Sequence, residues 1–586
     1  MTSSPLVVGP LLRYVDEVSA SIWVETRDAA VVTVTVGDRT LRAQTFAVHG
    51  HHYALVAVDG LEPGTVTSYT VEVAGARVWP PEQSPQTQQS KQSEQSKQSK
   101  QSDFPPSVIA TLATGRPLQL AFGSCRTSVP HDKQGNHTHG VDALRAYALR
   151  LAGIEAARTA DAARPDLLLF LGDQVYADVT SEAMKVFIRG RREISEPPGE
   201  ELADFHEYAH LYALAWTDPA NRWLLSTVST AMIFDDHDIR DDWNASLTWK
   251  RTMEATSWWH GRIVAGLASY WVYQHLGNLS PAERAEDEIW RRVAAHEKDA
   301  DADAAVRELD LTDVLDAFAA RCDRQPSTYR WSYCRDFTDT RLIVLDSRTT
   351  RVLEPSRRAL LDENETAWLN ERMQGGFRHL LIGTSLPFLL PTGLQRLESW
   401  NEAVSEGAWG HPAAVAGERM RQAVDLEHWG AFQRSFHEVA VMATELADGA
   451  RGPAPDTIMF LSGDVHYSYV EEVDRSSGSR IVQAVCSPIR NPLPLLLRSF
   501  SAVLSYGASR RLSGLLARSA RVPEPPFRWS GVTGPWFDNC LASLAITPNG
   551  VRLVWEAGVV DGRGHQHPRV KTVAEITLEP RPRHAT

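Results

Sequence analysis

The chain has 586 residues, which exceeds the roughly 100–200 residues of one typical domain, so we expect two or more folded units. Its net charge of −13 argues against nucleic acid as a stable partner, because such binding depends on neutralising phosphates. The five cysteines are sparse and include no Cys-x-x-Cys pair, which argues against a disulfide scaffold. The first residues do not resemble a signal peptide, and no apolar run reaches the ~18 residues of a membrane span, so we predict a cytoplasmic protein.

Residues 1–81 have the pattern of an all-β domain. Residues 31–36 are β-branched throughout and end at a Gly-Asp turn, and 21–25 and 54–58 are further short apolar segments. A Pro-Gly turn precedes Tyr69 in an alternating segment, which resembles the corner of a fibronectin type III domain. We therefore predict a small β-sandwich of the fibronectin or immunoglobulin kind.

Residues 82–104 form a low-complexity tract of Gln, Ser and Lys. Such a composition offers almost no apolar surface to bury, so we predict a solvated linker between the sandwich and the rest of the chain. The alternative is an insertion in a surface loop.

Residues 105–586 have an α/β pattern, because short apolar runs alternate with helical segments such as 141–158 and 310–320. The charged segment 287–308 predicts a peripheral helical insertion. Residues 551–555 and 572–578 return to the strand pattern.

One arrangement recurs in this region: a run of four or five apolar residues leads directly into acidic, His, Cys or Arg residues. The places are Phe122-Gly123-Ser124-Cys125-Arg126, Leu171-Gly172-Asp173-Gln174-Val175-Tyr176-Ala177-Asp178, Phe234-Asp235-Asp236-His237-Asp238, Leu345-Asp346-Ser347-Arg348 and Ser462-Gly463-Asp464-Val465-His466. Apolar runs of this kind predict strands that are buried on both faces. Because ligands bind beyond the carboxyl ends of such strands, we expect these polar groups to meet in one crevice.

Carboxylates gathered at neighbouring strand ends would repel one another, and a bound cation would relieve that repulsion. Carboxylates suit hard ions such as Ca²⁺, Mg²⁺ or Mn²⁺, whereas imidazole, thiolate and phenolate suit iron or zinc. The mixed set predicts two kinds of ion that share a bridging carboxylate, which is a known device for phosphoester hydrolysis. Some members have simpler explanations: Asp346 as a helix N-cap and Cys125 as a buried inert thiol. The histidine-bearing residues 131–139 form either a surface loop or the rim of the site.

The motifs that contain Cys125, Asp173, His237 and Asp464 resemble those of PhoD-type alkaline phosphatases, which belong to the calcineurin-like metallophosphoesterases. The resemblance extends over about residues 117–560, and an N-terminal β-sandwich also fits that family. It implies an α/β fold, a four-layer metallophosphoesterase β-sandwich flanked by helices. It also implies hydrolysis of phosphomonoesters, phosphodiesters or both through a metal-bound hydroxide.

The resemblance also implies the metals and their ligands. Iron and calcium are the usual metals of the family, with zinc, manganese and magnesium as alternatives. Cys125, Asp173, Tyr176 and His466 would hold the iron, and Asp173 would bridge to calcium, with Asp464, Asp236 and Asp242 as further ligands. Many relatives carry an asparagine near the place of Asp242, so this ligand departs from the family pattern, and Asn244 lies two residues further on.

His237 and Arg126 are the candidate catalytic residues. His237 falls where the wider superfamily has its catalytic histidine, and it would protonate the leaving alkoxide or stabilise charge on the phosphoryl oxygens. Arg126 would contact the substrate phosphate with both arms of its guanidinium. The alternative for Arg126 is a salt bridge to a nearby Asp.

Residues 475–523 differ in charge from the rest of the chain. No acidic residue lies between Asp474 and Glu524, and the segment is rich in arginine and leucine. Parts of 495–521 have the pattern of an amphipathic helix. We therefore predict peripheral contact with an anionic membrane, with an ordinary solvated face as the alternative.

The leading hypothesis is an enzyme that acts on small-molecule or lipid-linked phosphoesters. A second hypothesis is an anionic-surface binding protein with a residual metal site, and a third is hydrolysis of a non-phosphate ester or amide on the same scaffold. The sequence does not define an oligomeric state.

Overall fold

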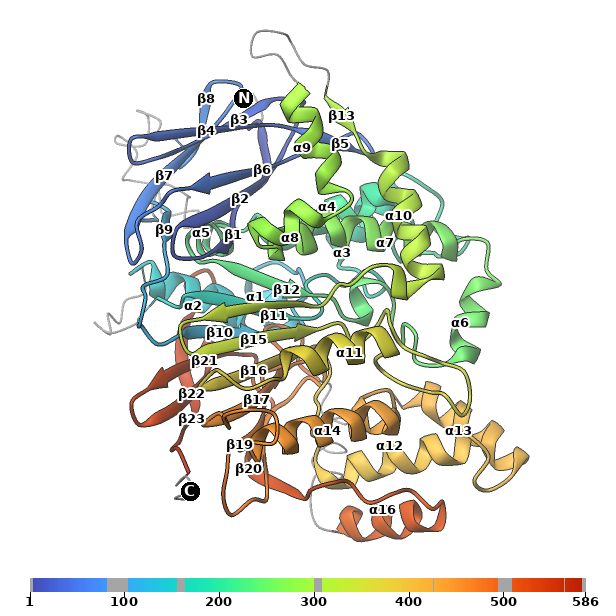
Figure 1. Cartoon of the computed structure of the whole chain (residues 1–586). Helices are drawn as coiled ribbons and strands as arrows, with labels where there is room; N and C mark the ends of the chain where they lie inside the picture. The colour runs from blue at the N-terminus through green and yellow to red at the C-terminus, as the bar shows by residue number, and fades with distance from the viewer. Residues whose placement is uncertain are drawn as a thin grey trace.

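The computed structural model of the chain describes residues 4–81, 104–154, 164–299, 308–424, 426–493, 508–562 and 564–581. It contains an N-terminal β-sandwich, two larger central sheets and helices on the outer faces of those sheets (Figure 1). In the view of Figure 1 the sandwich lies at the top and the central sheets cross the middle. Within the described residues, no helix combines the length and apolar character that crossing a membrane requires.

Two sheets form the sandwich, as the alternating segments of the first 81 residues predict. One has the order β1-β2-β6-β5-β13, and the other has the order β4-β3-β7-β8 with β9 paired to β7. The strands are β1 (Leu6–Val15), β2 (Ser19–Thr26), β3 (Val31–Val36), β4 (Arg39–Gln44), β5 (Phe46–Val48), β6 (His51–Asp59), β7 (Val66–Val73), β8 (Ala76–Trp79), β9 (Val108–Ala110) and β13 (Leu309–Asp310). In β3, Val32, Val34 and Val36 are buried while the two threonines are half-exposed, which is the alternation that a half-buried strand requires; Val31, at the start of the strand, is exposed.

Two strands of the sandwich come from beyond residue 81. Strand β9 pairs with β7, and β13 pairs with β5. Strands β8 and β9 both pair with β7, so residues 82–103 connect two strands of one sandwich. These residues, which carry the predicted linker, lie outside the described residues, and its solvation stays a prediction.

The first central sheet has the order β12-β11-β10-β21-β22-β23, with β10, β11 and β12 parallel. Its strands are β10 (Gln119–Gly123), β11 (Leu167–Leu171), β12 (Thr230–Ile233), β21 (Cys540–Thr547), β22 (Gly550–Val559) and β23 (Arg569–Leu578). The second has the order β14-β15-β16-β17-β19-β18-β20. Its strands are β14 (Tyr333–Phe337), β15 (Thr340–Leu345), β16 (His379–Thr384), β17 (Thr457–Ser462), β18 (Ser468–Val473), β19 (Arg480–Val485) and β20 (Trp529–Trp536).

The apolar runs are buried on both faces, as their composition predicts. In β11, Leu169 and Leu171 belong to a core that both central sheets share, while Phe170 belongs to the core on the opposite face. In β17, Met459 lies in the shared core and Phe460 in a third core against helices. The two central sheets therefore pack face to face, and the prediction of a mixed α/β fold is confirmed.

Helices cover the outer faces of the central sheets. Those that share a core with the first sheet are α2 (Ala143–Leu151), α3 (Glu182–Arg189), α4 (Phe205–Trp216), α5 (Pro219–Thr227), α6 (Leu247–Glu254), α7 (Trp259–Tyr270), α9 (Trp290–Asp299) and α10 (Thr312–Arg324). Those that share a core with the second sheet are α11 (Glu363–Arg372) and α14 (Gln433–Ala447). The others are α1 (Lys133–His139), α8 (Pro281–Glu286), α12 (Thr392–Ser405), α13 (His411–Ala423) and α16 (Ala508–Ser519). Short turns of helix are η3 (Asp236–Asp238), η4 (Trp271–His275), η5 (Leu276–Asn278), η6 (Pro326–Thr328) and η7 (Trp429–Ala431).

The predicted helical segments differ from the observed helices at their ends. The segment 310–320 corresponds to α10, which begins at Thr312 and continues to Arg324. The segment 141–158 contains α2, whose N-cap Asp142 accepts hydrogen bonds from two backbone N–H groups and so begins the helix later than predicted. The charged segment 287–308 contains α9, and its residues 300–307 lie outside the described residues.

Candidate metal centre

The candidate site lies where strands of both central sheets end. Strands β10, β11 and β12 of the first sheet lead into Cys125, Asp173 and Asp235, and β17 of the second leads into Asp464. Cys125 Sγ lies 3.6 Å from the carbonyl oxygen of Asp464, so the two sheets meet here. A Cβ on Gly463 would lie 1.9 Å from Ser124 Oγ, so only glycine allows this approach.

The turns that carry the site residues adopt left-handed backbone conformations. Non-glycine residues rarely do so, because their Cβ makes the conformation costly. At this site the positive φ angles are 57° at Cys125, 48° at Asp173, 62° at Asp242, 59° at Asn244, 65° at Asp464 and 56° at His466. Strained non-glycine backbone concentrated at one place is typical of a functional site.

Four of the predicted ligands form one group. Ligand atoms of Cys125, Asp173 and His466 all lie within 4.8 Å of one another. The Tyr176 hydroxyl lies 3.3 Å from Asp173 Oδ2 and 3.4 Å from His466 Nε2. The other carboxylate oxygen of Asp173, Oδ1, is buried without a hydrogen-bond partner. A buried acceptor that lacks a donor fits a position beside a cation.

The electrostatics of this group also fit a cation. Burial raises the pKa of the Cys125 thiol well above its ordinary value, and the carboxylates of Asp173 and Asp464 raise it further. Burial likewise raises the pKa of Tyr176, as do Cys125 and Asp173. A thiolate and a phenolate would therefore form here only beside a positive charge. This donor set suits a transition metal.

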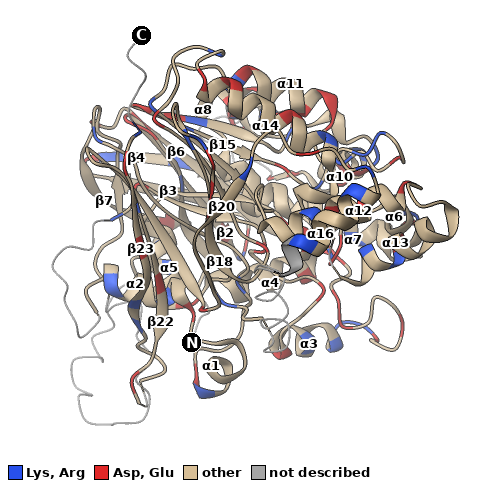
Figure 2. Cartoon of the chain, turned by 90° about the horizontal axis from the view of Figure 1, so that it is seen from below, with Lys and Arg blue, Asp and Glu red and all other residues tan. Residues whose placement is uncertain are grey.

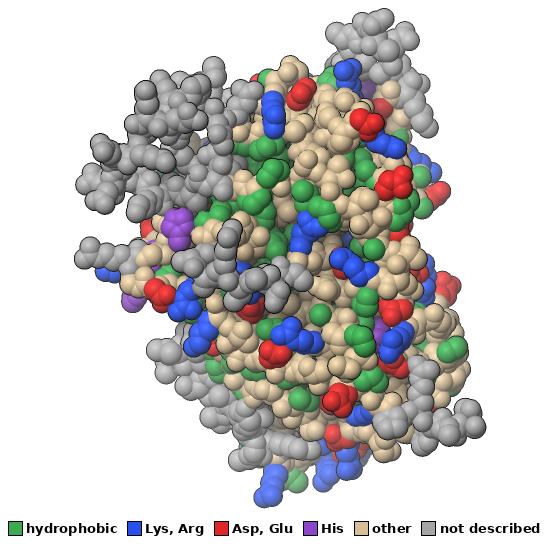
Figure 3. Space-filling model, turned by 90° about the vertical axis from the view of Figure 1, so that its left-hand side faces the viewer, with side chains coloured by type: hydrophobic (Ala, Val, Ile, Leu, Met, Phe, Trp, Pro, Cys, Tyr) green, Lys and Arg blue, Asp and Glu red, His purple; other side chains and the backbone are tan. Residues whose placement is uncertain are grey.

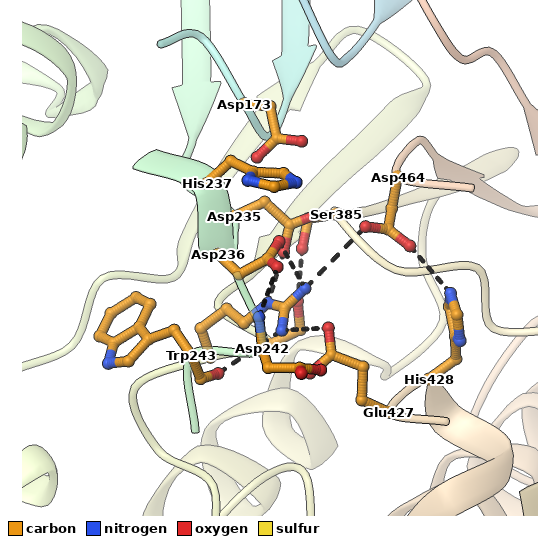
Figure 4. A network of polar contacts seen from close by, with 12 residues as sticks. Asp173, Asp235, Asp236, His237, Asp242, Trp243, Ser385, Glu427, His428 and Asp464 are labelled. Atoms are coloured by element: carbon orange, nitrogen blue, oxygen red, sulfur yellow. Dashed lines mark hydrogen bonds and ion pairs between the residues drawn. The ribbon is translucent and has the colours of Figure 1, made fainter. Parts of the chain in front are cut away.

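Aspartates form a second group next to the first. Ligand atoms of Asp173, Asp235 and Asp236 lie within 4.8 Å of one another, so Asp173 belongs to both groups. Burial raises the pKa of Asp173 well above its usual range, and Asp235 is among the carboxylates that add to this. The carboxylates of Asp235 and Asp236, both labelled in Figure 4, also form ion pairs with Arg348, which is fully buried.

Asp242 and Asp464 lie beside these groups, and neither belongs to the clusters found among the described residues. The backbone N–H of Asp242 donates to Asp236 Oδ2 at 3.0 Å. Asp464 Oδ2 lies 2.8 Å from His428 Nε2. His428 Nδ1 in turn lies 2.6 Å from Glu398 Oε1, which is fully buried on α12. The His428 imidazole thus links Asp464 to Glu398 of helix α12.

His237 stands next to both groups. Its Nδ1 lies 2.9 Å from the carboxylate oxygens of Asp178, and its ring packs 4.7 Å from the ring of Tyr176. Burial lowers the pKa of His237, but the carboxylates of Asp178 and Asp236 outweigh burial, so the net pKa lies well above the ordinary value. The contact with Asp178 leaves Nε2 directed elsewhere, 3.8 Å from Asp241.

Arg126 makes the salt bridge that was the alternative to phosphate contact. Its Nε and Nη2 lie 3.0 and 2.8 Å from Asp142 Oδ2, and its Nη1 donates to the carbonyl oxygen of Ala215 at 2.8 Å. Because all three nitrogens have protein partners, contact with a substrate would require this salt bridge to open.

Several site residues were not singled out from the sequence. Asp235 and Arg348 stand within the quoted motifs, beside residues that were chosen. Glu427 and His428 follow α13 rather than an apolar strand, so no strand-end pattern marks them. Asp346 is a local turn residue, because its carboxylate accepts from the backbone N–H groups of Arg348 and Thr349. The histidine-bearing segment 131–139 contains helix α1.

The arginine-rich segment 475–523 does not form one cationic face. Arg490 is buried and donates to the carbonyl oxygens of Gly140, Val129 and Pro130. Arg480 pairs with Glu472. Residues 494–507 lie outside the described residues, and helix α16 follows them, with Leu512 61% and Leu515 63% exposed. Figure 2 shows basic residues on α16. On the face of the molecule that Figure 3 shows, acidic and basic side chains are interspersed.

Comparisons with known proteins agree with this site. Residues 147–494, more than half of the chain, match the family model described as PhoD-like phosphatase. Residues 3–91 match a domain family of unknown function. A solved structure titled "Structure of PhoD" is similar with a TM-score of 0.56 and 12% identity, over 99% of this chain and 91% of that one.

Two other solved structures, a maltogenic amylase from S. marinus and a type III pullulan hydrolase from Thermococcus kodakarensis, have TM-scores of only 0.13 and 0.12. The amylase is 8% identical over 98% of this chain and 82% of its own. The pullulan hydrolase is 9% identical over 95% of each chain. No curated protein matches the sequence. The match over residues 147–494 is the decisive comparison: the chain belongs to the PhoD-like phosphatase family and is a phosphoric ester hydrolase.

Proposed function

We propose that the chain hydrolyses phosphomonoesters, phosphodiesters or both at the centre that Asp173 shares between two ligand groups. The observation that carries the proposal is the convergence of Cys125, Asp173 and His466 beside a second cluster of Asp173, Asp235 and Asp236. Two adjacent metal sites that share a carboxylate suit in-line displacement at phosphorus. The alternative of a binding protein with a residual site requires a damaged ligand set, and the residues of both groups are present.

The two groups differ in the metals that they would hold. Cys125, Asp173, Tyr176 and His466 combine soft and hard donors, which suits iron, with zinc as an alternative. Asp173 with Asp235 and Asp236 offers only carboxylates, which suits calcium, manganese or magnesium. Asp464 and Asp242 remain proposed ligands of this second ion. When bound, the metals would supply an activated hydroxide and neutralise the phosphoryl oxygens.

His237 is the proposed general acid. Its Nδ1 is engaged by Asp178 at 2.9 Å, which orients the ring and leaves Nε2 to donate a proton to the leaving alkoxide. The nearby carboxylates raise the pKa of this imidazole against the effect of burial, which favours the protonated form that a general acid needs. Arg126 stays a proposed phosphate contact only if its salt bridge to Asp142 opens on substrate binding.

Hydrolysis of an aryl phosphate and of a bis-aryl phosphate by the purified full chain tests this function. We expect at least one substrate to be hydrolysed, and a metal chelator to abolish that activity. Re-addition of iron and calcium should restore it. Activity that survives complete removal of the metals would contradict the proposal, and the ratio of the two rates separates monoesterase from diesterase.

Contact with an anionic membrane is a second, separate proposal. Two leucines of α16, Leu512 and Leu515, are exposed on the same helix as the exposed Arg511 and Arg518. Apolar side chains beside arginines are typical of helices that lie on anionic lipid surfaces. We expect co-sedimentation with vesicles that contain phosphatidylserine at low salt, and its loss in a Leu512→Glu/Leu515→Glu variant. Equal sedimentation of both proteins would exclude α16 as the contact. The cytoplasmic location stays a prediction.

A further inference from the structure

Arg348 lies at the junction of the two halves of the metal centre. It follows β15 of the second central sheet and is 0% exposed. Its Nε lies 2.5 Å from Asp235 Oδ1 and its Nη2 2.9 Å from Asp236 Oδ1, and these two aspartates follow β12 of the first sheet. Its Nη2 also lies 3.9 Å from Asp464 Oδ1. One guanidinium thus faces carboxylates that both sheets contribute, and Figure 4 labels these carboxylates as Asp235, Asp236 and Asp464.

A fourth carboxylate, that of Glu427, pairs with the remaining nitrogen of the Arg348 guanidinium. Glu427 Oε1 lies 2.5 Å from Arg348 Nη1, and Glu427 Oε2 lies 3.1 Å from Arg351 Nη1. Arg351 is held in turn by the carbonyl oxygen of Ser347, to which its Nε donates at 2.8 Å. Two buried arginines therefore share Glu427, and this keeps Arg348 directed at the centre.

The turn after β15 determines where the Arg348 side chain begins. Asp346 Oδ1 accepts from the backbone N–H of Arg348 at 2.8 Å and from that of Thr349 at 3.0 Å. Such a local turn holds the backbone without help from the metal centre. The planar guanidinium then needs little rearrangement to pair with several carboxylates at once.

Carboxylates outnumber the cationic side chains around Arg348. Four carboxylates, those of Asp235, Asp236, Glu427 and Asp464, face the guanidinium groups of Arg348 and Arg351, and the His428 imidazole also pairs with Asp464. Charges interact strongly inside a protein, where water does not screen them. Loss of one arginine would leave a larger negative excess, and a hard cation is the group that best removes it.

We propose that Arg348 is a permanent cation of this centre, which positions Asp235, Asp236 and Asp464 for the second ion and takes the place that a third divalent ion would otherwise occupy beside them. The inference rests on the metal dependence of the proposed function. Arg348 is a positioning residue rather than a catalytic one, because each of its side-chain nitrogens faces a carboxylate of the protein.

Metal content measured by mass spectrometry, after dialysis against excess Ca²⁺ and gel filtration, tests this role. Arg348→Met should gain about one divalent ion per chain over the unmodified protein, because hard cations fill carboxylate sites. Arg348→Lys keeps the charge and should keep the original ratio. Arg145→Met is the matched control: Arg145 is also buried and pairs with Asp218, and it should leave the ratio unchanged. An unchanged ratio in Arg348→Met would overturn the inference.

Glu427→Gln tests the same claim by changing a partner of Arg348 instead of Arg348 itself. It decides the claim if Arg348→Met does not fold. This variant keeps Arg348 but removes one of its carboxylate partners, so more of its positive charge stays uncompensated beside the aspartates, and calcium should bind about tenfold more weakly. Unchanged affinity would overturn the inference. If the unmodified chain binds no metal, both this inference and the proposed function fail. If it binds metal but the variants match it, only the inference fails.

Discussion

Asp173 is the residue on which the centre depends, because it is the only one common to the Cys125 group and the Asp235 group among the described residues. Its φ of 48° turns the chain sharply after β11, and its neighbour Gly172 has a φ of 101°. A Cβ on Gly172 would lie 2.6 Å from the Asp235 side chain, so the Gly-Asp order of this motif has a steric reason. The sequence predicts Asp173 as the centre of the motif, but the left-handed backbone conformation that directs its side chain could not be predicted from residue types.

Tyr176 gives the first prediction at the residue scale. Tyr176→Phe should abolish visible absorption of the iron-loaded protein, because the colour would come from a tyrosinate–iron bond. Absorption spectra of the purified variant measure this. Tyr147→Phe, which removes a buried hydroxyl elsewhere, should keep the colour. Equal colour in both variants would remove Tyr176 from the ligand set.

His237 gives the second prediction at the residue scale. His237→Ala should lower kcat by about 10²–10⁴, the usual scale for a general acid. Metal content should change little, which separates a proton donor from a ligand. Steady-state kinetics with an aryl phosphate, together with metal analysis, provide the measurement. A kcat equal to that of the unmodified enzyme would remove His237 from the mechanism.

At the scale of the elements, the strands were easier to predict than the helix and the loop that supply the other side of the site. The run 167–171 is strand β11 itself, and 458–461 lies within β17, because strands buried on both faces leave an unbroken apolar run. Glu398, Glu427 and His428 come from helix α12 and from the segment after α13, and only tertiary packing brings them to Asp464. Their polar types occur throughout surface helices, so no local pattern could distinguish them.

The link from Glu398 of α12 through His428 to Asp464 makes a prediction at this scale. His428→Ala should weaken metal binding by about 10–100-fold, the range for residues that orient metal ligands, because Asp464 would lose its partner. Titration of the chelator-treated protein with calcium measures the affinity. His379→Ala serves as control, since His379 is buried at the start of β16, the opposite end of the strands. If both variants bind calcium equally, Glu398 and His428 do not support the centre.

At the scale of the whole molecule, the sandwich and the phosphatase region share one core. Trp23 of β2 packs 5.3 Å from the ring of Tyr273, and Arg13 of β1 donates to the carbonyl oxygens of Tyr273 and Gln274. The Tyr69 hydroxyl, predicted to belong to a fibronectin-like corner, donates to the carbonyl oxygen of Ser226 at the end of α5. The composition predicts a division of the chain at residue 81. It does not predict that β9 and β13 join the sandwich, and it does not predict these shared contacts.

The shared core predicts how the molecule unfolds. Arg13→Ala should lower the free energy of unfolding by about 2–4 kcal/mol, because it leaves buried carbonyl groups without a charged donor. The sandwich and the phosphatase region should still unfold in one transition. Calorimetry measures both, with the exposed Arg27→Ala as control. Two separate transitions in the unmodified chain would contradict a common core.

The central claim is that Asp173 bridges two different metals. Anomalous-scattering maps from crystals of the full chain, collected above and below the iron absorption edge, test it most directly. We expect an iron peak bounded by Cys125, Tyr176 and His466, and a second peak without iron signal on the other side of Asp173, beside Asp235 and Asp236. A single peak, or a peak at the Cys125 group without iron signal, would contradict this account.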